Sequence, residues 1–322
     1  MRVLFVSDTH VGIDTPSRRR RGAVEPIGDP HLTSFERALE PALSGWIDVV
    51  VHGGDLLAHS RLPLGVVDRA LEPLRRVADA GVHVLLVPGN HERSDIPYPL
   101  LAVHPRIHVF RAPRTVVVTR GTSRFAFGGF PYYRGGVRER FRSLVAETRL
   151  DAADADARVL CMHHCVEASS CGVFRWRVTS ADGAREPASS SFTFTSQPDV
   201  VRARDLPARA AVVLSGHIHR HQLVARDLAG RRLSTPVLYA GSVERTSLAE
   251  SNETKGYVLL ALAPGDGGAG RVVRWVFRPL SVEALTPFTG ARRVATSPSP
   301  AIAGSGSLGI GARSSVAYPL RR

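Results

Sequence analysis

Acidic, amide and imidazole side chains recur in five short motifs, each of which directly follows a strand-like apolar run. The motifs are Asp8-Thr9-His10, Gly54-Asp55, Gly89-Asn90-His91-Glu92, His163 and Gly216-His217-Ile218-His219. Carboxylate, imidazole and amide oxygen together are suitable ligands for Mn²⁺, Fe and Zn²⁺. Two such ions about 3.5–4 Å apart stabilise an in-line displacement at phosphorus and generate hydroxide near neutral pH. The residue types therefore predict a dinuclear centre for hydrolysing phosphate esters.

A pair of metal ions needs one bridging carboxylate and further ligands for each ion. Asp55 is the predicted bridge. The other predicted ligands are Asp8, His10 and His219 on one side, and Asn90, His163 and His217 on the other. Glycines precede three of these motifs, and glycine lets the backbone turn sharply so that neighbouring side chains approach closely.

Each motif also has an ordinary structural explanation when it is taken alone. Asp-x-His is found in capped loops, Gly-Asp in turns, and Gly-His-x-His describes a surface pair on one face of a strand as well as a pair of ligands. The agreement of order, strand-end position and ligand type across five motifs favours the metal centre. One choice stays open locally. Adjacent strand residues face opposite ways, so only one of His163 and His164 can be a ligand.

The elements that must position these motifs alternate between strand and helix in the first part of the chain. Predicted strands are Val3–Val6, Ile47–Val51, Val82–Val87, Thr115–Thr119, Arg124–Phe127, Val159–Met162, Ala211–Leu214, Pro236–Tyr239, Tyr257–Leu260 and Arg271–Phe277. Predicted helices are Thr33–Leu43, with Thr33 and Glu36 as a capping box, and Val66–Ala80, which Gly81 ends. This order indicates an α/β fold, in which sites gather beyond the carboxyl ends of the strands.

The second part of the chain is mostly strands, as expected of a second sheet packed on the first. Residues 172–207 are rich in Ser, Thr and Arg and predict a loop-rich insertion. Residues 286–322 consist largely of Gly, Ser, Ala and Arg without an apolar period, which is typical of a disordered tail. We therefore predict one domain over residues 1–285, followed by the tail.

Composition favours a reducing compartment and a polyanionic partner. The formal net charge is +13, and Lys255 is the only lysine, so arginine supplies the positive charge. Arginine binds phosphate bidentately, and a basic protein attracts nucleic acid. The three cysteines cannot form a fully paired disulfide framework and include no Cys-x-x-Cys pair, which argues against both a disulfide scaffold and a zinc site. No signal peptide and no apolar run of bilayer length are recognisable, so we expect a cytoplasmic protein without a membrane segment.

The five motifs, in this order, resemble the signature of the calcineurin-like metallophosphoesterases over about residues 1–262. The resemblance implies a four-layer αββα sandwich, with two mixed β-sheets flanked by helices. It also implies that His163, rather than His164, is the ligand. In this family the His91 position holds a histidine that binds no metal; it protonates the leaving oxygen or stabilises the transition state.

Within this family the chain is most similar to SbcD-type DNA repair exonucleases. The similarity lies in Asp8-Thr9-His10-Val11-Gly12, in Tyr239-Ala240-Gly241-Ser242-Val243-Glu244-Arg245 and in Glu253-Thr254-Lys255-Gly256-Tyr257. It implies two Mn²⁺ ions, DNA as substrate, an SbcC-like ATPase partner and a homodimer. Fe or Zn²⁺ would suit the same ligands. SbcD-type enzymes carry a substantial DNA-binding cap and an ATPase-docking segment after the catalytic domain, whereas only 65 residues follow Tyr257 here.

Two other functions remain open. The centre could serve a phosphodiesterase or phosphatase that acts on small nucleotides or phosphoproteins, or the fold could be a scaffold or DNA-binding module without catalysis. All ligand positions are present, which disfavours the scaffold. The run Arg18–Arg21 follows the first motif and is a candidate DNA contact or a solvated loop. His59 lies where SbcD-type enzymes often have an accessory histidine.

Overall fold

The computed structural model describes residues 1–13, 29–92, 104–178 and 185–282. Its core consists of two six-stranded sheets. The first has the order β16-β15-β1-β2-β3-β4 and the second the order β13-β14-β12-β7-β6-β5. The first sheet contains β1 (Arg2–Val6), β2 (Val49–His52), β3 (His83–Leu86), β4 (Ile107–Val109), β15 (Gly256–Ala263) and β16 (Arg271–Pro279). The second contains β5 (Arg114–Arg120), β6 (Ser123–Gly129), β7 (Ala157–Met162), β12 (Val212–Ser215), β13 (Gln222–Arg226) and β14 (Arg232–Tyr239).

Both sheets are mixed. Strands β1 to β4 run parallel to one another, whereas β15 runs antiparallel to β1, and β16 runs antiparallel to β15. In the second sheet β6, β7, β12 and β14 are parallel, with β5 and β13 antiparallel at the edges. The parallel strands of one sheet therefore end at the same edge, and the predicted motifs follow five of them.

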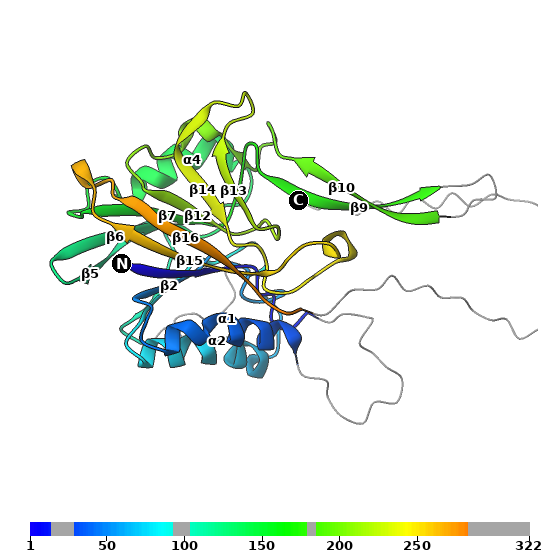
Figure 1. The fold of residues 1–322 in the computed structure, drawn as a ribbon, viewed down its shortest axis with the longest axis horizontal. Helices are drawn as coiled ribbons and strands as arrows, with labels where there is room; N and C mark the ends of the chain where they lie inside the picture. The colour runs from blue at the N-terminus through cyan, green and yellow to red at the C-terminus, as the bar shows by residue number, and fades with distance from the viewer. Residues whose placement is uncertain (14–28, 93–103, 179–184, 283–322) are drawn as a thin grey trace, which may run out of the picture. The chain divides into compact units, whose positions relative to one another are not determined.

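Helices cover the outer face of each sheet (Figure 1). Helices α1 (Pro30–Leu43) and α2 (Leu64–Asp79) pack on the first sheet, and α4 (Val137–Glu147) packs on the second. Short 3₁₀ helices are η2 (Ala203–Asp205), η3 (Leu248–Glu250) and η4 (Asp266–Gly268). The layers are helix, sheet, sheet, helix, so the predicted four-layer α/β sandwich is confirmed.

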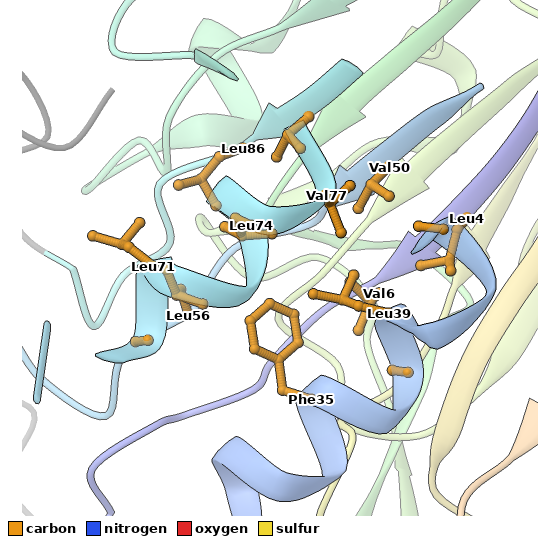
Figure 2. Close-up of a cluster of buried hydrophobic side chains, with 14 of the residues drawn as sticks. Leu4, Val6, Phe35, Leu39, Val50, Leu56, Leu71, Leu74, Val77 and Leu86 are labelled. Atoms are coloured by element: carbon orange, nitrogen blue, oxygen red, sulfur yellow. The ribbon is translucent and has the colours of Figure 1, made fainter. Parts of the chain in front are cut away.

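Strand periodicity explains the layering. Along β1, Leu4 and Val6 contact the helices, whereas Val3 and Phe5 face the second sheet. Figure 2 shows the helix side, where Phe35 of α1 packs among the side chains of the first sheet. Successive strand residues point to opposite faces, and both faces of this sheet are covered. This is why β1 and its neighbours read as continuous apolar runs.

The first helix begins earlier than predicted. It starts at Pro30, and the side chain of Asp29 accepts hydrogen bonds from the backbone nitrogens of His31 and Leu32. The prediction of Thr33 as the capping residue was therefore wrong. Proline suits the first helical position because its missing N–H would have no partner there, and the aspartate before it is a strong cap.

Residues 172–207 contain paired strands where a loop-rich insertion was expected. Strand β9 (Ser170–Val178) pairs antiparallel with β10 (Arg185–Thr193), and the short β8 (Cys165–Val166) pairs with β11 (Val200–Val201). The serine-rich composition of the segment suggested a loop. The sequence Phe174-Arg175-Trp176-Arg177-Val178 has the period of two that is typical of a strand, and this alternation was the better signal.

The chain divides into Met1–Pro287 and Phe288–Arg322. The predicted tail 286–322 and the run Arg18–Arg21 lie outside the described residues. Among the helices of the described ranges, none has both the length and the apolar character that crossing a bilayer requires.

Candidate metal centre

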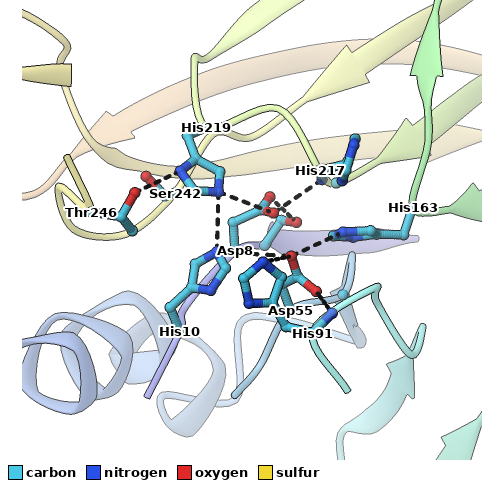
Figure 3. A network of polar contacts seen from close by, with 12 residues as sticks. Asp8, His10, Asp55, His91, His163, His217, His219, Ser242 and Thr246 are labelled. Carbon is cyan, nitrogen blue, oxygen red and sulfur yellow. Dashed lines mark hydrogen bonds and ion pairs between the residues drawn. The ribbon is translucent and has the colours of Figure 1, made fainter. Parts of the chain in front are cut away.

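The structure brings all eight predicted residues to one place, at the carboxyl ends of strands from both sheets. Figure 3 labels seven of them, all except Asn90. Asp8 and His10 follow β1, Asp55 follows β2, and Asn90 and His91 follow β3. His163 follows β7, and His217 and His219 follow β12. We call these eight residues the candidate metal centre. The two sheets face each other, so loops from each reach the same point although they are far apart in sequence.

One group of donor atoms comprises Asp8, His10 and His219, called the first ligand group. The Nε2 atoms of His10 and His219 are 3.0 Å apart. The Oδ1 atom of Asp8 lies 3.8 Å from Nε2 of His219. One donor atom from each residue falls within 4.8 Å of the others. This spacing is compatible with a single cation bound between them.

The second ligand group comprises Asn90, His163 and His217. The Oδ1 atom of Asn90 lies 3.0 Å from Nε2 of His163 and 2.8 Å from Nδ1 of His217. The Asp55 carboxylate lies between the two groups. Its Oδ2 atom is 3.2 Å from Nε2 of His163 and 3.8 Å from Nε2 of His10. Asp55 is thus positioned to be shared by two cations.

The hydrogen bonds of His163 leave one ring nitrogen facing other acceptor atoms, as in a cation site. Its Nδ1 lies 2.7 Å from the carbonyl oxygen of Gly53, which can only accept, so Nδ1 carries the hydrogen. Its Nε2 faces Oδ2 of Asp55 and Oδ1 of Asn90, both of which are acceptors. Lone pairs therefore converge on one point, and a divalent cation fits this set of donors.

Electrostatics at the centre agree with cation binding. Burial and the neighbouring His219 ring hold the pKa of His10 well below its usual value, and burial and the His163 ring lower the pKa of His217 to about 3. Burial also disfavours a charged His163, but the Asp55 carboxylate outweighs it and raises the pKa of His163 to about 9. Neutral imidazole is the form that binds metal. The lowered pKa values keep His10 and His217 in this neutral form. A cation bound beside Asp55 would replace the second proton of His163.

Backbone strain is concentrated in the same loops. Six non-glycine residues of the described chain have positive φ, and four of them belong to the candidate metal centre: Asp8 at 52°, His10 at 47°, Asp55 at 53° and His217 at 80°. Such conformations cost free energy and persist where the surrounding structure imposes them, often at functional sites. Here they turn the chain so that side chains from separate strands converge.

Gly54 and Gly89 are required because the side chains of predicted ligands pack directly against their backbone. A Cβ atom on Gly54 would lie 2.3 Å from Nδ1 of His163, and one on Gly89 would lie 2.2 Å from Oδ1 of Asp55. Any larger residue at either position would displace a predicted ligand. The sequence indicated sharp turns at these glycines, whereas the structure adds direct packing against the ligands.

His164 points away from the centre. Its Nε2 accepts a hydrogen bond from the backbone nitrogen of Tyr133, and its ring stacks on Tyr132 with centroids 4.7 Å apart. Of the two histidines, His163 is the one whose ring lies beside Asp55 and Asn90, and its role as a ligand stays a prediction. Tyr132, which the sequence analysis did not select, also lies 5.7 Å from the His217 ring, centroid to centroid.

His91 lies at the edge of the centre. Its Nδ1 is 2.6 Å from the carbonyl oxygen of Ala58, and its Nε2 is 3.8 Å from Oδ2 of Asp55. Its side chain is 42% exposed, compared with 2% for Asp55 and 3% for His10. A substrate can therefore reach His91. His10, Asp55 and His91 also form a third cluster that could hold a cation, so a ligand role competes with a role in proton transfer.

Glu92, the last residue of its motif, braces the loops rather than joining the ligands. Its Oε1 accepts from the backbone nitrogen of Leu57 and its Oε2 from that of Gly89. The buried carboxylate therefore joins the loop after β2 to the loop after β3. It fixes the separation between Asp55 and Asn90.

Glu250 is a residue of the site that the sequence analysis missed. Its Oε1 lies 3.0 Å from Nδ1 of His219, and its Oε2 lies 2.7 Å from Nζ of Lys255. Lys255 is fully buried and also donates to the carbonyl oxygen of His219. Burial disfavours the charged ring of His219, but the hydrogen bond to Glu250 outweighs it and raises the pKa. A carboxylate on the far nitrogen of a ligand histidine orients the ring and increases its basicity. Glu250 belongs to none of the sequence motifs, so no local pattern marks it.

We expect Glu250→Gln to weaken binding of the metal ion that His219 holds by about 10- to 100-fold. Glutamine has the same size as glutamate but lacks the negative charge that Glu250 places beside His219 and Lys255. Metal retained after dialysis against a graded chelator series measures the effect. Glu253→Gln is the matched control, because Glu253 contacts Lys255 and Arg220 but not His219. Equal loss in both variants would assign the effect to folding.

Three comparisons with known proteins found similar sequences and folds. Residues 1–221 match the family model of the calcineurin-like phosphoesterases. The DNA double-strand break repair protein Mre11 of Haloferax volcanii is 30% identical over 82% of this chain and 50% of its own length. Mre11 of Aeropyrum pernix is 26% identical over 86% of this chain and 62% of its own length. The chain thus spans less than two thirds of either relative. A solved dimetal phosphatase from Danio rerio aligns over 87% of this chain and 99% of that chain, at 12% identity and a TM-score of 0.45.

Proposed function

Because the chain belongs to the calcineurin-like phosphoesterase family, we propose that it hydrolyses DNA phosphodiesters at two Mn²⁺ ions, as an exo- or endonuclease of SbcD type. The position of Asp55 between the two ligand groups is the observation that carries the dinuclear part of this proposal. The first ligand group would hold one ion, the second would hold the other, and Asp55 would bind both. Bound there, the two ions would offset the charge of the phosphate and lower the pKa of a water.

His91 acts as the proton donor to the leaving oxygen. Its Nδ1 is engaged with the carbonyl of Ala58, so Nε2 is the nitrogen that faces the substrate. As the water oxygen bonds to phosphorus and the ester bond breaks, the leaving oxygen takes the Nε2 proton, and the proton of the water passes to solvent. Protonation by a positioned side chain typically accelerates such a step by about 10²- to 10⁴-fold.

DNA is the substrate favoured by two independent facts. The Mre11 relatives are named as proteins of DNA double-strand break repair. The formal net charge of +13 would attract a polyanion, and phosphate neutralisation supplies much of the affinity for DNA. We propose a cytoplasmic location, and the three cysteines, all unpaired, agree with a reducing compartment. The resemblance to SbcD-type exonucleases supports an SbcC-like ATPase partner and a homodimer as further proposals.

The test is degradation of linear double-stranded DNA by the purified protein with Mn²⁺, beside a chelator control and with bis(p-nitrophenyl) phosphate in parallel. Chelator-sensitive degradation of DNA is expected, with Mg²⁺, Zn²⁺ and Fe²⁺ less effective than Mn²⁺. Hydrolysis of the small diester without cleavage of DNA would keep the metal centre and move the substrate to small phosphodiesters. If neither DNA nor bis(p-nitrophenyl) phosphate were hydrolysed in the presence of metal, the proposal that the protein is a phosphoesterase would be refuted.

A further inference from the structure

An open pocket of about 510 Å³ lies against the candidate metal centre. Within the described residues it is lined by His59, Ser60, Arg61, Asn90, His91 and Arg134. Pockets that bind small ligands occupy about 300–1,000 Å³. The pocket therefore has room for a group larger than a single phosphate, and it shares a wall with His91.

The named lining groups suit an anion. Arg61 and Arg134 are exposed, and neither forms an ion pair in the part of the chain that the structure describes. Among the described residues that line the pocket there is no carboxylate. Many other arginines are paired, such as Arg75 with Asp68 and Arg138 with Glu167. Two guanidinium groups at one pocket are suited to bidentate contact with phosphate oxygens.

The pocket lies beside the residue proposed to protonate the leaving oxygen. His91 is the proposed proton donor to the leaving oxygen, and the pocket lies on the side of the centre where His91 is found. We propose that Arg61 and Arg134 bind the phosphate of the leaving nucleotide, next to the scissile phosphodiester. This inference rests on the proposed function and makes it narrower. The enzyme would prefer a polynucleotide to an isolated diester because the neighbouring phosphate is bound as well.

Three dinucleotides test the inference. They are thymidylyl-thymidine without a terminal phosphate, with a phosphate at its 5′ end, and with a phosphate at its 3′ end. Only one of the added phosphates belongs to the leaving nucleotide. The products identify which one, since a product with a new 5′ phosphate means that the 3′ oxygen of the preceding nucleotide left. We expect the wild type to hydrolyse that dinucleotide about 10- to 100-fold faster, in kcat/KM, than the one without a terminal phosphate.

The variant is Arg61→Ala/Arg134→Ala, and it should lose this preference while it still binds two metal ions. The matched control is Arg232→Ala/Arg271→Ala, which removes the same charge. Both control arginines are exposed. They begin β14 and β16, at the ends of these strands that lie away from the centre. A second readout is independent of catalysis. Without metal, the salt dependence of binding to a labelled single-stranded oligonucleotide should become shallower by about one unit of slope for each lost phosphate contact.

The outcomes distinguish failure of the DNA-nuclease proposal from failure of the proposed phosphate subsite. A wild type that hydrolyses bis(p-nitrophenyl) phosphate but no nucleotide would refute the DNA substrate. Equal rates on all three dinucleotides, or acceleration by the phosphate on the side opposite the leaving nucleotide, would refute the subsite and leave the nuclease standing. Equal losses on every substrate, bis(p-nitrophenyl) phosphate included, would place the two arginines at the metal centre and also overturn the subsite.

Discussion

Asp55→Ala is expected to remove both metal ions and to slow hydrolysis of DNA by about 10⁴-fold or more. The Asp55 carboxylate lies between the two ligand groups, with Oδ2 3.2 Å from Nε2 of His163 and 3.8 Å from Nε2 of His10. Metal ions contribute several kcal/mol to stabilising charge in such reactions, and each 1.4 kcal/mol is about tenfold in rate. Metal content by elemental analysis and kcat at saturating Mn²⁺ measure the two effects.

Folding must be separated from metal loss in this experiment. The Oδ1 atom of Asp55 also accepts from the backbone nitrogen of His91, so alanine disturbs the loop. Asp55→Asn retains an acceptor there and changes mainly the charge. Asp205→Ala serves as a control, because Asp205 is buried and pairs with Arg142 away from the ligands. If Asp55→Asn retained both ions, the bridging role would be wrong.

His91→Ala is expected to keep both metal ions and to reduce kcat on DNA by about 10²- to 10⁴-fold. The reason is that the leaving oxygen loses its proton donor, while the two ligand groups remain intact. A substrate with a good leaving group needs less protonation. The loss should therefore be much smaller on bis(p-nitrophenyl) phosphate than on DNA, and this difference distinguishes proton transfer from a general disturbance.

His104→Ala is the matched control for His91, since His104 lies before β4 and pairs with Asp79 at the end of α2, at the opposite ends of the strands from the centre. It should leave the ratio between the two substrates unchanged. The structure offers a competing role for His91 in the cluster with His10 and Asp55. A His91→Ala protein with fewer than two bound ions would show that His91 is a ligand and that the proton donor lies elsewhere.

The residue types of the site could be predicted from the sequence because they depend on short patterns. A strand followed by Gly-Asp, or by Gly-Asn-His, places a polar side chain at a sheet edge whatever follows later in the chain. The apolar runs likewise predicted the sheets, since both faces of β1 and its neighbours are covered. Errors arose where two local signals competed. The capping box at Thr33 was predicted, whereas Asp29 caps the helix, and the serine-rich segment around β9 and β10 also had a period of two.

Only the tertiary structure decided which distant groups support the ligands. Glu250 reaches His219 across 31 positions, and the carbonyl of Gly53 reaches His163 across 110. The same holds for the pocket that brings Arg61 and Arg134 beside His91. Neither relation leaves a periodic trace, because a single contact between loops constrains one side chain rather than a run of residues. The sequence by itself therefore determined which groups can bind metal, and the packing of the two sheets decided how they are oriented, charged and approached.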